Sequence, residues 1–313
     1  MNPHILLPQR CKAGVVSING PHYQLAVTEV AVPKPGKAHP RTMQLNASGL
    51  CYTDIHYMLE DLALPRMGDY GAHSPGHEGA GVVVAVGHDV KGWKPGDRAG
   101  IAHTCDTCMS CELCSSDMEC HCPDAVPIGL KVSGMYQQYV VSPARYTTYS
   151  KWHLRESHLH AGQWVIIIGA GGGVGNMGVQ IAKAMGLRVI GADTGKGKEQ
   201  LSDAQGAHGV LVTASSAAAY QVAPLLLRVG AIVVCVGMTA SGSASAGDDP
   251  MYIILNNLKI VGSLTGFQDT IGALLLAARG LLEPVYEAFS IDQLPHAVDR
   301  LRQGKVKGRC VVD

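Results

Sequence analysis

The 313-residue sequence lacks several features that would place it in a specialised class of protein. It has no run of about 18 consecutive apolar residues, so we expect no transmembrane helix. Its first ten residues, MNPHILLPQR, lack the basic start, apolar run and small-residue cleavage site of a signal peptide. It also lacks an excess of positive charge, since Lys plus Arg and Asp plus Glu are both 25. These absences predict a cytoplasmic protein with neither a nucleic-acid nor a membrane partner.

What remains is the composition of an ordinary globular protein, with 47% apolar and 16% charged residues. The length is sufficient for two domains, each with its own hydrophobic core. In a reducing compartment thiols persist, which argues against disulfides among the ten cysteines.

Six of those cysteines lie in one short segment, CDTCMSCELCSSDMECHC, at residues 105–122. The spacing C-x2-C-x2-C-x7-C is typical of a closed, four-thiolate structural zinc site. An iron–sulfur cluster is the less favoured alternative, because no further cysteine run accompanies the segment. We interpret Cys105 and Cys120 as spare surface thiols. The predicted zinc ligands are Cys108, Cys111, Cys114 and Cys122.

A second, mixed set of polar residues precedes this segment. GLCYTDIHYM contains Cys51, Thr53, Asp54 and His56, and the later PGHEGAG places His77 and Glu78 between glycines. A thiol, an imidazole and a carboxylate next to glycine-permitted tight turns suit a catalytic zinc site. Such a site has three protein ligands and one exchangeable position.

The segment QWVIIIGAGGGVGNMGVQIAKAMGLRVIGAD, at 163–193, has the pattern strand, glycine turn, helix, strand. This order predicts a Rossmann dinucleotide site, with the pyrophosphate at the amino end of the helix. Asp193 ends the second strand and should accept hydrogen bonds from the ribose hydroxyls, which favours NAD over NADP. The residues expected at the pyrophosphate are Gly171, Gly172, Gly173, Val174 and Gly175.

Taken in order, these motifs resemble the zinc-dependent alcohol dehydrogenases of the medium-chain dehydrogenase/reductase family, most of all the yeast and fungal type. QQYVVSPARY at 137–146 and the carboxyl-terminal GKVKGRCVVD belong to the same resemblance. It implies an α/β fold with a GroES-like, β-rich catalytic domain and a Rossmann doubly wound parallel sheet. We expect the catalytic domain at 1–150, the cofactor domain at 151–283 and a return to the catalytic domain at 284–313.

The resemblance also implies roles for the mixed set. Cys51 and His77 would bind the catalytic zinc, and Asp54 would orient a ligand imidazole. Thr53 and His56 would relay the proton of the alcohol to solvent. Zinc lowers the pKa of a bound alcohol, so that hydride can pass to the nicotinamide of NAD.

Two further residues receive roles from the resemblance: Lys198 would contact the adenosine ribose, and Arg309 the pyrophosphate. The implied substrate is a small-molecule alcohol, aldehyde or ketone. The implied assembly is a homo-oligomer, a dimer or a tetramer, formed through the cofactor domains.

The sequence departs from the family at the third catalytic zinc ligand, which is a cysteine in the relatives. The segment that would carry it is missing between Thr148 and Trp152, and no cysteine replaces it. Three outcomes are open. Glu78 could complete the ligand set, His153 could do so, or the site could bind zinc poorly.

A second departure follows Asp193, where a helix and a strand of the family pattern are missing. We therefore expect a Rossmann sheet that lacks one edge βα unit and has the Asp193 strand at its edge. A third concerns the substrate pocket. Met58, Leu62 and His103 replace tryptophans, and Tyr52 replaces a basic residue that contacts the cofactor phosphates in yeast-type enzymes. The tryptophan replacements predict a roomier pocket for a substrate bulkier than ethanol, with purely structural changes as the alternative.

The leading functional hypothesis is a zinc-dependent oxidoreductase that interconverts an alcohol and an aldehyde or ketone with NAD(H). By analogy alone, its setting would be fungal secondary metabolism. The alternative is a catalytically impaired or inactive relative that retains the structural zinc and dinucleotide binding. A zinc-independent reductase is disfavoured, because such an enzyme has no use for the full set of Cys51, Asp54, His56, His77 and Glu78.

Overall fold

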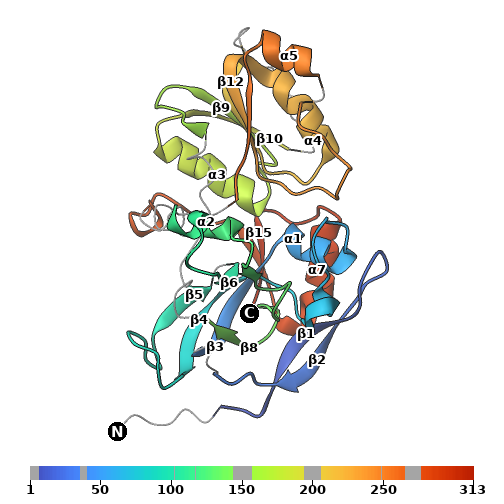
Figure 1. Cartoon of the computed structure of the whole chain (residues 1–313), viewed down its shortest axis with the longest axis vertical. Helices are drawn as coiled ribbons and strands as arrows, with labels where there is room; N and C mark the ends of the chain where they lie inside the picture. Colours follow the sequence, from blue (N-terminus) through green and yellow to red (C-terminus); the bar gives the residue numbers. More distant parts are fainter. Residues whose placement is uncertain are drawn as a thin grey trace. The chain divides into compact units, whose positions relative to one another are not determined.

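The structure is a computed structural model in which the chain divides into two units (Figure 1). Unit 1 comprises Met1–Tyr149, Glu287–Val306 and Cys310–Asp313, and unit 2 comprises Ser150–Tyr286 and Lys307–Arg309. The expected deletion between Thr148 and Trp152, and also His153 and Lys198, lie outside the described residues. Those residues are 7–35, 41–101, 103–116, 118–143, 157–193, 206–247, 249–264 and 276–313.

Unit 1 is built mainly of antiparallel strands. Its six-stranded sheet has the order β14-β15-β3-β4-β5, with β8 also paired to β3. Two-stranded sheets are formed by β1 with β2 and by β6 with β7. The strands are β1 (Arg10–Ile18), β2 (Gln24–Ala31), β3 (Arg41–Leu50), β4 (Glu78–Val86), β5 (Arg98–Ile101), β6 (Thr104–Asp106), β7 (Val126–Pro127), β8 (Tyr139–Ser142), β14 (Tyr286–Phe289) and β15 (Arg309–Val312).

Short helices complete unit 1. Helix α1 (Tyr52–Leu59) buries Ile55 and Met58 in a core that also contains Leu294 and Val298 of α7 (Leu294–Arg302). The spacing of three residues between Ile55 and Met58 puts both side chains on one face of α1. The remaining helices are η1 (Met67–Tyr70), α2 (Glu112–Ser115), η2 (Glu119–His121) and η5 (Ile291–Gln293).

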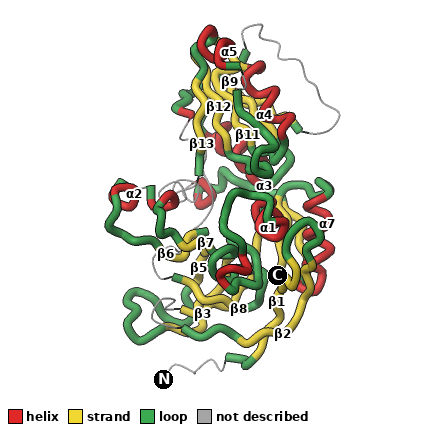
Figure 2. Tube along the Cα trace, turned by 45° about the vertical axis from the view of Figure 1, so that its right-hand side comes forward, coloured by secondary structure: helices red, strands yellow, loops and turns green. Residues whose placement is uncertain are grey.

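Unit 2 contains a five-stranded parallel sheet of order β10-β9-β11-β12-β13. Figure 2 labels β9, β11, β12 and β13 of this sheet, drawn in yellow. Strand β9 lies between β10 and β11, and the middle of its apolar run is buried, as expected for a parallel strand covered on both faces. The predicted order of strand, glycine turn, helix and strand is confirmed. The elements are β9 (Trp164–Ile168), α3 (Gly173–Ala184), β10 (Arg188–Ala192), β11 (Ala207–Val212), α4 (Ala217–Val222), η4 (Ala223–Leu226), β12 (Leu227–Cys235), α5 (Pro250–Leu255) and β13 (Lys259–Gly262).

Within the described residues the parallel sheet ends at β10, the strand that leads to Asp193. This is the edge position expected from the missing βα unit. Among these residues no helix combines the length and apolar character needed to cross a membrane.

Candidate active site

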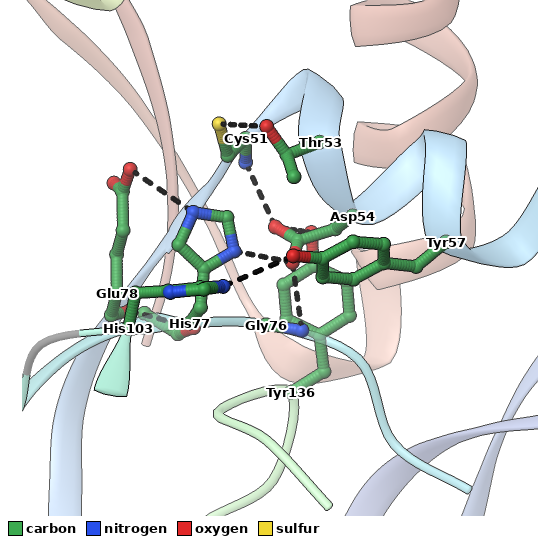
Figure 3. Close-up of polar contacts among 10 residues, drawn as sticks. Cys51, Thr53, Asp54, Tyr57, Gly76, His77, Glu78, His103 and Tyr136 are labelled. Carbon is green, nitrogen blue, oxygen red and sulfur yellow. Dashed lines mark hydrogen bonds and ion pairs between the residues drawn. The ribbon is translucent and has the colours of Figure 1, made fainter. Parts of the chain in front are cut away.

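Three of the expected ligands come together in unit 1. Donor atoms of Cys51, His77 and Glu78 all lie within 4.8 Å of one another (Figure 3). Cys51 immediately precedes α1, whereas His77 and Glu78 stand at the start of β4. Strand β4 pairs with β3, and β3 ends at Leu50 beside Cys51. The antiparallel pairing therefore brings together residues that are distant in the sequence.

The carboxylate of Glu78 is directed to this cluster. One oxygen, Oε1, lies 3.9 Å from Nε2 of His77. The residue facing Glu78 across the strand pair is Gly49, and a Cβ added to Gly49 would lie 2.5 Å from Oε2 of Glu78. The Ser48 hydroxyl donates a hydrogen bond to the backbone carbonyl of Glu78 at 3.2 Å. The hydrogen bond fixes the start of β4, and the absence of a side chain at Gly49 leaves room for the Glu78 carboxylate.

Asp54 connects the two ligand segments, since it is fully buried and accepts four hydrogen bonds. Its Oδ1 accepts from the Gly76 N–H at 3.1 Å and from Nδ1 of His77 at 2.8 Å. Its Oδ2 accepts from the Cys51 N–H and from the Tyr136 hydroxyl, both at 3.1 Å. Figure 3 shows the His77 ring between the carboxylates of Asp54 and Glu78. With Nδ1 bonded to Asp54, Nε2 is the nitrogen available to a cation.

The same contacts determine the protonation state of His77 when no cation is bound. Burial disfavours the imidazolium ion, but the Asp54 carboxylate opposes this through its charge and its hydrogen bond, and Cys51 adds to it. Together they raise the pKa of His77 to about 10. A cation that binds Nε2 must displace this proton, so binding is coupled to proton release.

The two residues expected to relay a proton lie at different places on α1. The Thr53 hydroxyl oxygen lies 3.5 Å from Sγ of Cys51, at the ligand cluster. Nδ1 of His56 lies 2.7 Å from Oδ1 of Asp61. The His56 side chain is 5% exposed and that of Asp61 is 29% exposed, so the carboxylate is the part of this pair that reaches solvent. The motif did not identify Asp61; its only sequence signal is a carboxylate five residues after His56.

The three pocket replacements occupy different surroundings. Met58 is fully buried in the unit 1 core, which favours the purely structural alternative for this replacement. Leu62 packs against a small cluster that contains Tyr57. His103 alone contacts a candidate ligand, because its ring meets that of His77 edge-on at a centroid distance of 5.3 Å. Its Nε2 lies 3.0 Å from the Tyr57 hydroxyl, a contact that the sequence did not indicate.

The four-cysteine segment folds as its spacing predicts. The ligand atoms of all four expected cysteines lie within 4.8 Å of one another. The sulfurs of Cys108 and Cys122 are 3.5 Å apart, and those of Cys111 and Cys122 are 3.9 Å apart. Backbone N–H groups of Ser110 and Cys111, followed by the neighbouring thiols, lower the pKa of Cys108 to about 6. Cys108 therefore favours the thiolate form, which is the form in which a cysteine binds a metal.

Cys105 is not the surface thiol that we expected. It lies in β6, is 3% exposed and packs in a core cluster with Ala99 and Ile128. Desolvation, with a smaller effect of the Asp106 charge, raises the pKa of Cys105 to about 12. Apolar neighbours from distant strands cause this burial, and the local sequence does not reveal them.

In unit 2 the glycine turn lies between β9 and α3, as expected. The Gly171 N–H donates to Oδ2 of Asp193, which places this carboxylate at the turn. The Gly308 N–H donates to the Gly171 carbonyl at 2.8 Å. A Cβ added to Gly173 would lie 2.8 Å from Nε of Arg309, so the guanidinium group is packed on the first residue of α3. Apart from Lys198, the residues assigned to the cofactor are thus gathered at the amino end of α3.

A family match and a sequence relative both identify this chain as similar to alcohol dehydrogenases. Residues 38–152 match the alcohol dehydrogenase GroES-like domain. The chain is 33% identical to an alcohol dehydrogenase of Schizosaccharomyces pombe (strain 972 / ATCC 24843) over 352 aligned positions, covering 98% of this chain and 99% of the relative. Because the alignment is longer than the chain, internal segments of the relative have no counterpart here, in agreement with the expected deletions.

Solved structures show the same fold. Acetophenone reductase from Geotrichum candidum NBRC 4597, in complex with NAD, aligns with a TM-score of 0.82 at 25% identity over 98% of each chain. The cobalt- and zinc-bound thermostable alcohol dehydrogenase from Pyrobaculum aerophilum aligns with a TM-score of 0.83 at 21% identity, over 97% of this chain and 99% of that one. The latter likeness shows the fold alone. The expected pairing of a GroES-like unit with a Rossmann-like unit is confirmed, and the chain belongs to the alcohol dehydrogenase family of oxidoreductases.

Proposed function

We propose that this family member is a zinc-dependent alcohol dehydrogenase that uses NAD(H), with Cys51, His77 and Glu78 as the ligands of its catalytic zinc. The convergence of one thiol, one imidazole and one carboxylate within 4.8 Å is the observation that carries the proposal. Zinc–ligand bonds of roughly 2.0–2.3 Å in a tetrahedron place neighbouring donors about 3.3–3.8 Å apart. The 3.9 Å between His77 and Glu78 is close to that range, so small side-chain rotations would close the site.

A zinc ion held there would act as a Lewis acid toward the oxygen of the substrate. The chain's own residues supply the remaining functions. Asp54 holds the His77 imidazole in the orientation that presents Nε2 to the cluster. Thr53, next to the Cys51 sulfur, is the proposed first acceptor of the alcohol proton. His56 is the proposed second group of the relay, and its contact with Asp61 supports an outlet to solvent.

The glycine turn is the proposed NAD site, where NAD would supply the nicotinamide that exchanges hydride with the substrate. Backbone N–H groups at the start of α3, together with the Arg309 guanidinium, suit a pyrophosphate. The Asp193 carboxylate suits ribose hydroxyls and disfavours a 2′-phosphate. The complex of the acetophenone reductase with NAD supports the choice of cofactor. We assign a second, structural zinc to Cys108, Cys111, Cys114 and Cys122.

The finer parts of the proposal concern substrate, assembly and location. His103 beside His77 supports a pocket that differs from that of ethanol-specialised relatives, with a bulkier alcohol or carbonyl compound as substrate. The apolar side chains of Met251, Ile254 and Leu255 on α5 are 67–75% exposed, which supports a homo-oligomer formed through unit 2. Thiolate ligand sets need reduced cysteines, which supports a cytoplasmic location.

A catalytically impaired relative that keeps only the structural zinc is the second candidate. The observation in its favour is the sequence from 123 to 234, which contains no cysteine to serve as the third ligand found in relatives. The two candidates differ in whether Glu78 can replace that cysteine.

Zinc content separates them. Purified chain, dialysed to equilibrium and measured by mass spectrometry of its metals, should contain two zinc ions and oxidise alcohols with NAD. Glu78→Gln should contain one zinc ion and lose this activity. The control Glu60→Gln makes the same change at a carboxylate that faces Arg66 instead, and it should retain both ions. If Glu78→Gln retains two ions and full activity, Glu78 is not a ligand. If the parent chain holds one ion and is inactive, the second candidate is correct.

A further inference from the structure

Tyr136 is a buried residue for which the sequence motifs supply no role. Its side chain is 1% exposed and packs in the unit 1 core with Leu50 and Ile55. Its hydroxyl donates to Oδ2 of Asp54 at 3.1 Å, as Figure 3 shows. Its backbone N–H donates to the Pro75 carbonyl at 3.0 Å, two residues before His77. Tyr136 is therefore attached both to the carboxylate that orients His77 and to the segment that carries His77.

The hydrogen bonds of Asp54 are evenly divided. A carboxylate has about four lone-pair sites, and here two donors approach each oxygen. Three donors come from the ligand-bearing segments themselves: the Cys51 N–H, the Gly76 N–H and the His77 ring. The fourth, the Tyr136 hydroxyl, belongs to a different segment that is fixed by the core. It is thus the contact that ties the Asp54 carboxylate to a residue outside the ligand-bearing segments, whose side chain is held in the unit 1 core.

This contact restrains rotation of the carboxylate. The terminal torsion of an aspartate has a broad energy minimum, so its orientation depends on its hydrogen bonds. Without the Tyr136 hydroxyl, Oδ2 would be restrained by the Cys51 N–H alone. Rotation of the carboxylate would then move Oδ1, to which the His77 ring is bonded at 2.8 Å. A displaced ring would no longer direct Nε2 at the point shared with Cys51 and Glu78.

We propose that Tyr136 is a positioning residue for the metal site: its hydroxyl locks Asp54 and thereby holds the His77 imidazole in the orientation that binds the cation. The inference rests on the proposed function, because it requires a cation at Cys51, His77 and Glu78. It assigns no contact between Tyr136 and substrate or cofactor. Loss of the Tyr136 hydroxyl should lower the metal affinity directly, and should lower catalytic activity only through the loss of the metal.

The test is Tyr136→Phe, which removes one oxygen and leaves the ring in the core. Zinc affinity is measured by competition with a chromophoric chelator, for the first and the second ion of each chain. Loss of such an indirect ligand contact typically weakens metal binding by 10–100-fold, so we expect about tenfold weaker binding of the ion at His77. The ion at the four-cysteine cluster serves as an internal reference and should be unaffected.

Tyr23→Phe is the matched control. Among the described residues no group meets the buried Tyr23 hydroxyl in hydrogen-bond geometry, and the Tyr23 ring packs against the same core cluster as Tyr136. Removal of that oxygen should leave both zinc affinities unchanged. Thermal unfolding of the zinc-free variants should show whether either substitution disturbs the fold itself.

The outcomes are distinguishable. Selective weakening of one ion in Tyr136→Phe alone supports the proposal. Equal affinity of Tyr136→Phe and the parent chain for both ions overturns it, as does an equal loss at both clusters or the same loss in Tyr23→Phe. If the parent chain binds only the ion at the four cysteines, the proposed function itself fails, which is a different result from all of these.

Discussion

Gly49 and Glu78 face each other across the β3–β4 pair, and the carboxylate of Glu78 occupies the space where a side chain at position 49 would lie. A Cβ at Gly49 would lie 2.5 Å from Oε2 and 3.3 Å from Cβ of Glu78. The glycine is therefore a condition for the carboxylate's approach to Cys51 and His77.

Gly49→Ala should displace the Glu78 carboxylate and weaken zinc binding at its cluster by about tenfold or more, because a ligand is moved from its position. Equilibrium zinc titration of the purified variant checks this. Gly262→Ala is the control, since Gly262 also lies in a strand but a Cβ added there would have none of the described residues within 4 Å. Tight binding of two ions by Gly49→Ala would show that the carboxylate does not need this space.

Asp193→Ala should change the choice between the two dinucleotides. The variant loses the carboxylate that is proposed to bind the ribose hydroxyls and to repel a 2′-phosphate. The ratio of kcat/KM for NAD to that for NADP should fall by about tenfold or more, roughly 1.4 kcal/mol of discrimination. Steady-state kinetics with both cofactors measures it. Asp89→Ala, at an exposed carboxylate of unit 1, should leave the ratio unchanged. An unaltered ratio in Asp193→Ala would remove the ribose assignment.

The buried thiol of Cys105 predicts a loss of stability in alkali. Its pKa is raised from the ordinary 9.0 to about 12 by burial. Between these values the unfolded chain releases the thiol proton while the folded chain retains it, so the unfolded state is favoured as pH rises above 9. Cys105→Ala lacks this effect. The Tm of the parent chain minus that of Cys105→Ala should therefore decrease from pH 8 to pH 10.5. Thermal unfolding at several pH values gives the difference, and a constant value across the range would mean that Cys105 ionises as readily in the folded chain as in the unfolded one.

The features that could be predicted from the sequence are those that leave a pattern in a short segment of the chain. The four-cysteine cluster follows from spacing within one loop, and the glycine turn follows from the order of strand, turn and helix around residues 169–175. Cys51 and His77 are distant in the sequence and come together only through the pairing of β3 with β4. Their association was therefore inferred from the family resemblance. Glu78 was one of three open outcomes, and the structure places its carboxylate with them.

The features that the sequence did not reveal depend on tertiary packing. Tyr136 meets Asp54 across 82 positions of the chain, and Cys105 is buried by residues of other strands. The end of α4 is a further example: η4 follows α4 directly, and β12 begins at Leu227. Pro224, which lacks a backbone N–H, stands at the start of η4 and disfavours continuation of α4.

The most direct test of the account is the structure of the zinc-loaded chain, with the ions located by anomalous diffraction. We predict an ion bonded to Sγ of Cys51, Nε2 of His77 and a carboxylate oxygen of Glu78, at about 2.0–2.3 Å from each. A second ion should lie among the four cysteines. A fully loaded crystal in which the four cysteines hold zinc, while Cys51 and His77 hold none or bind it without Glu78, would contradict the account.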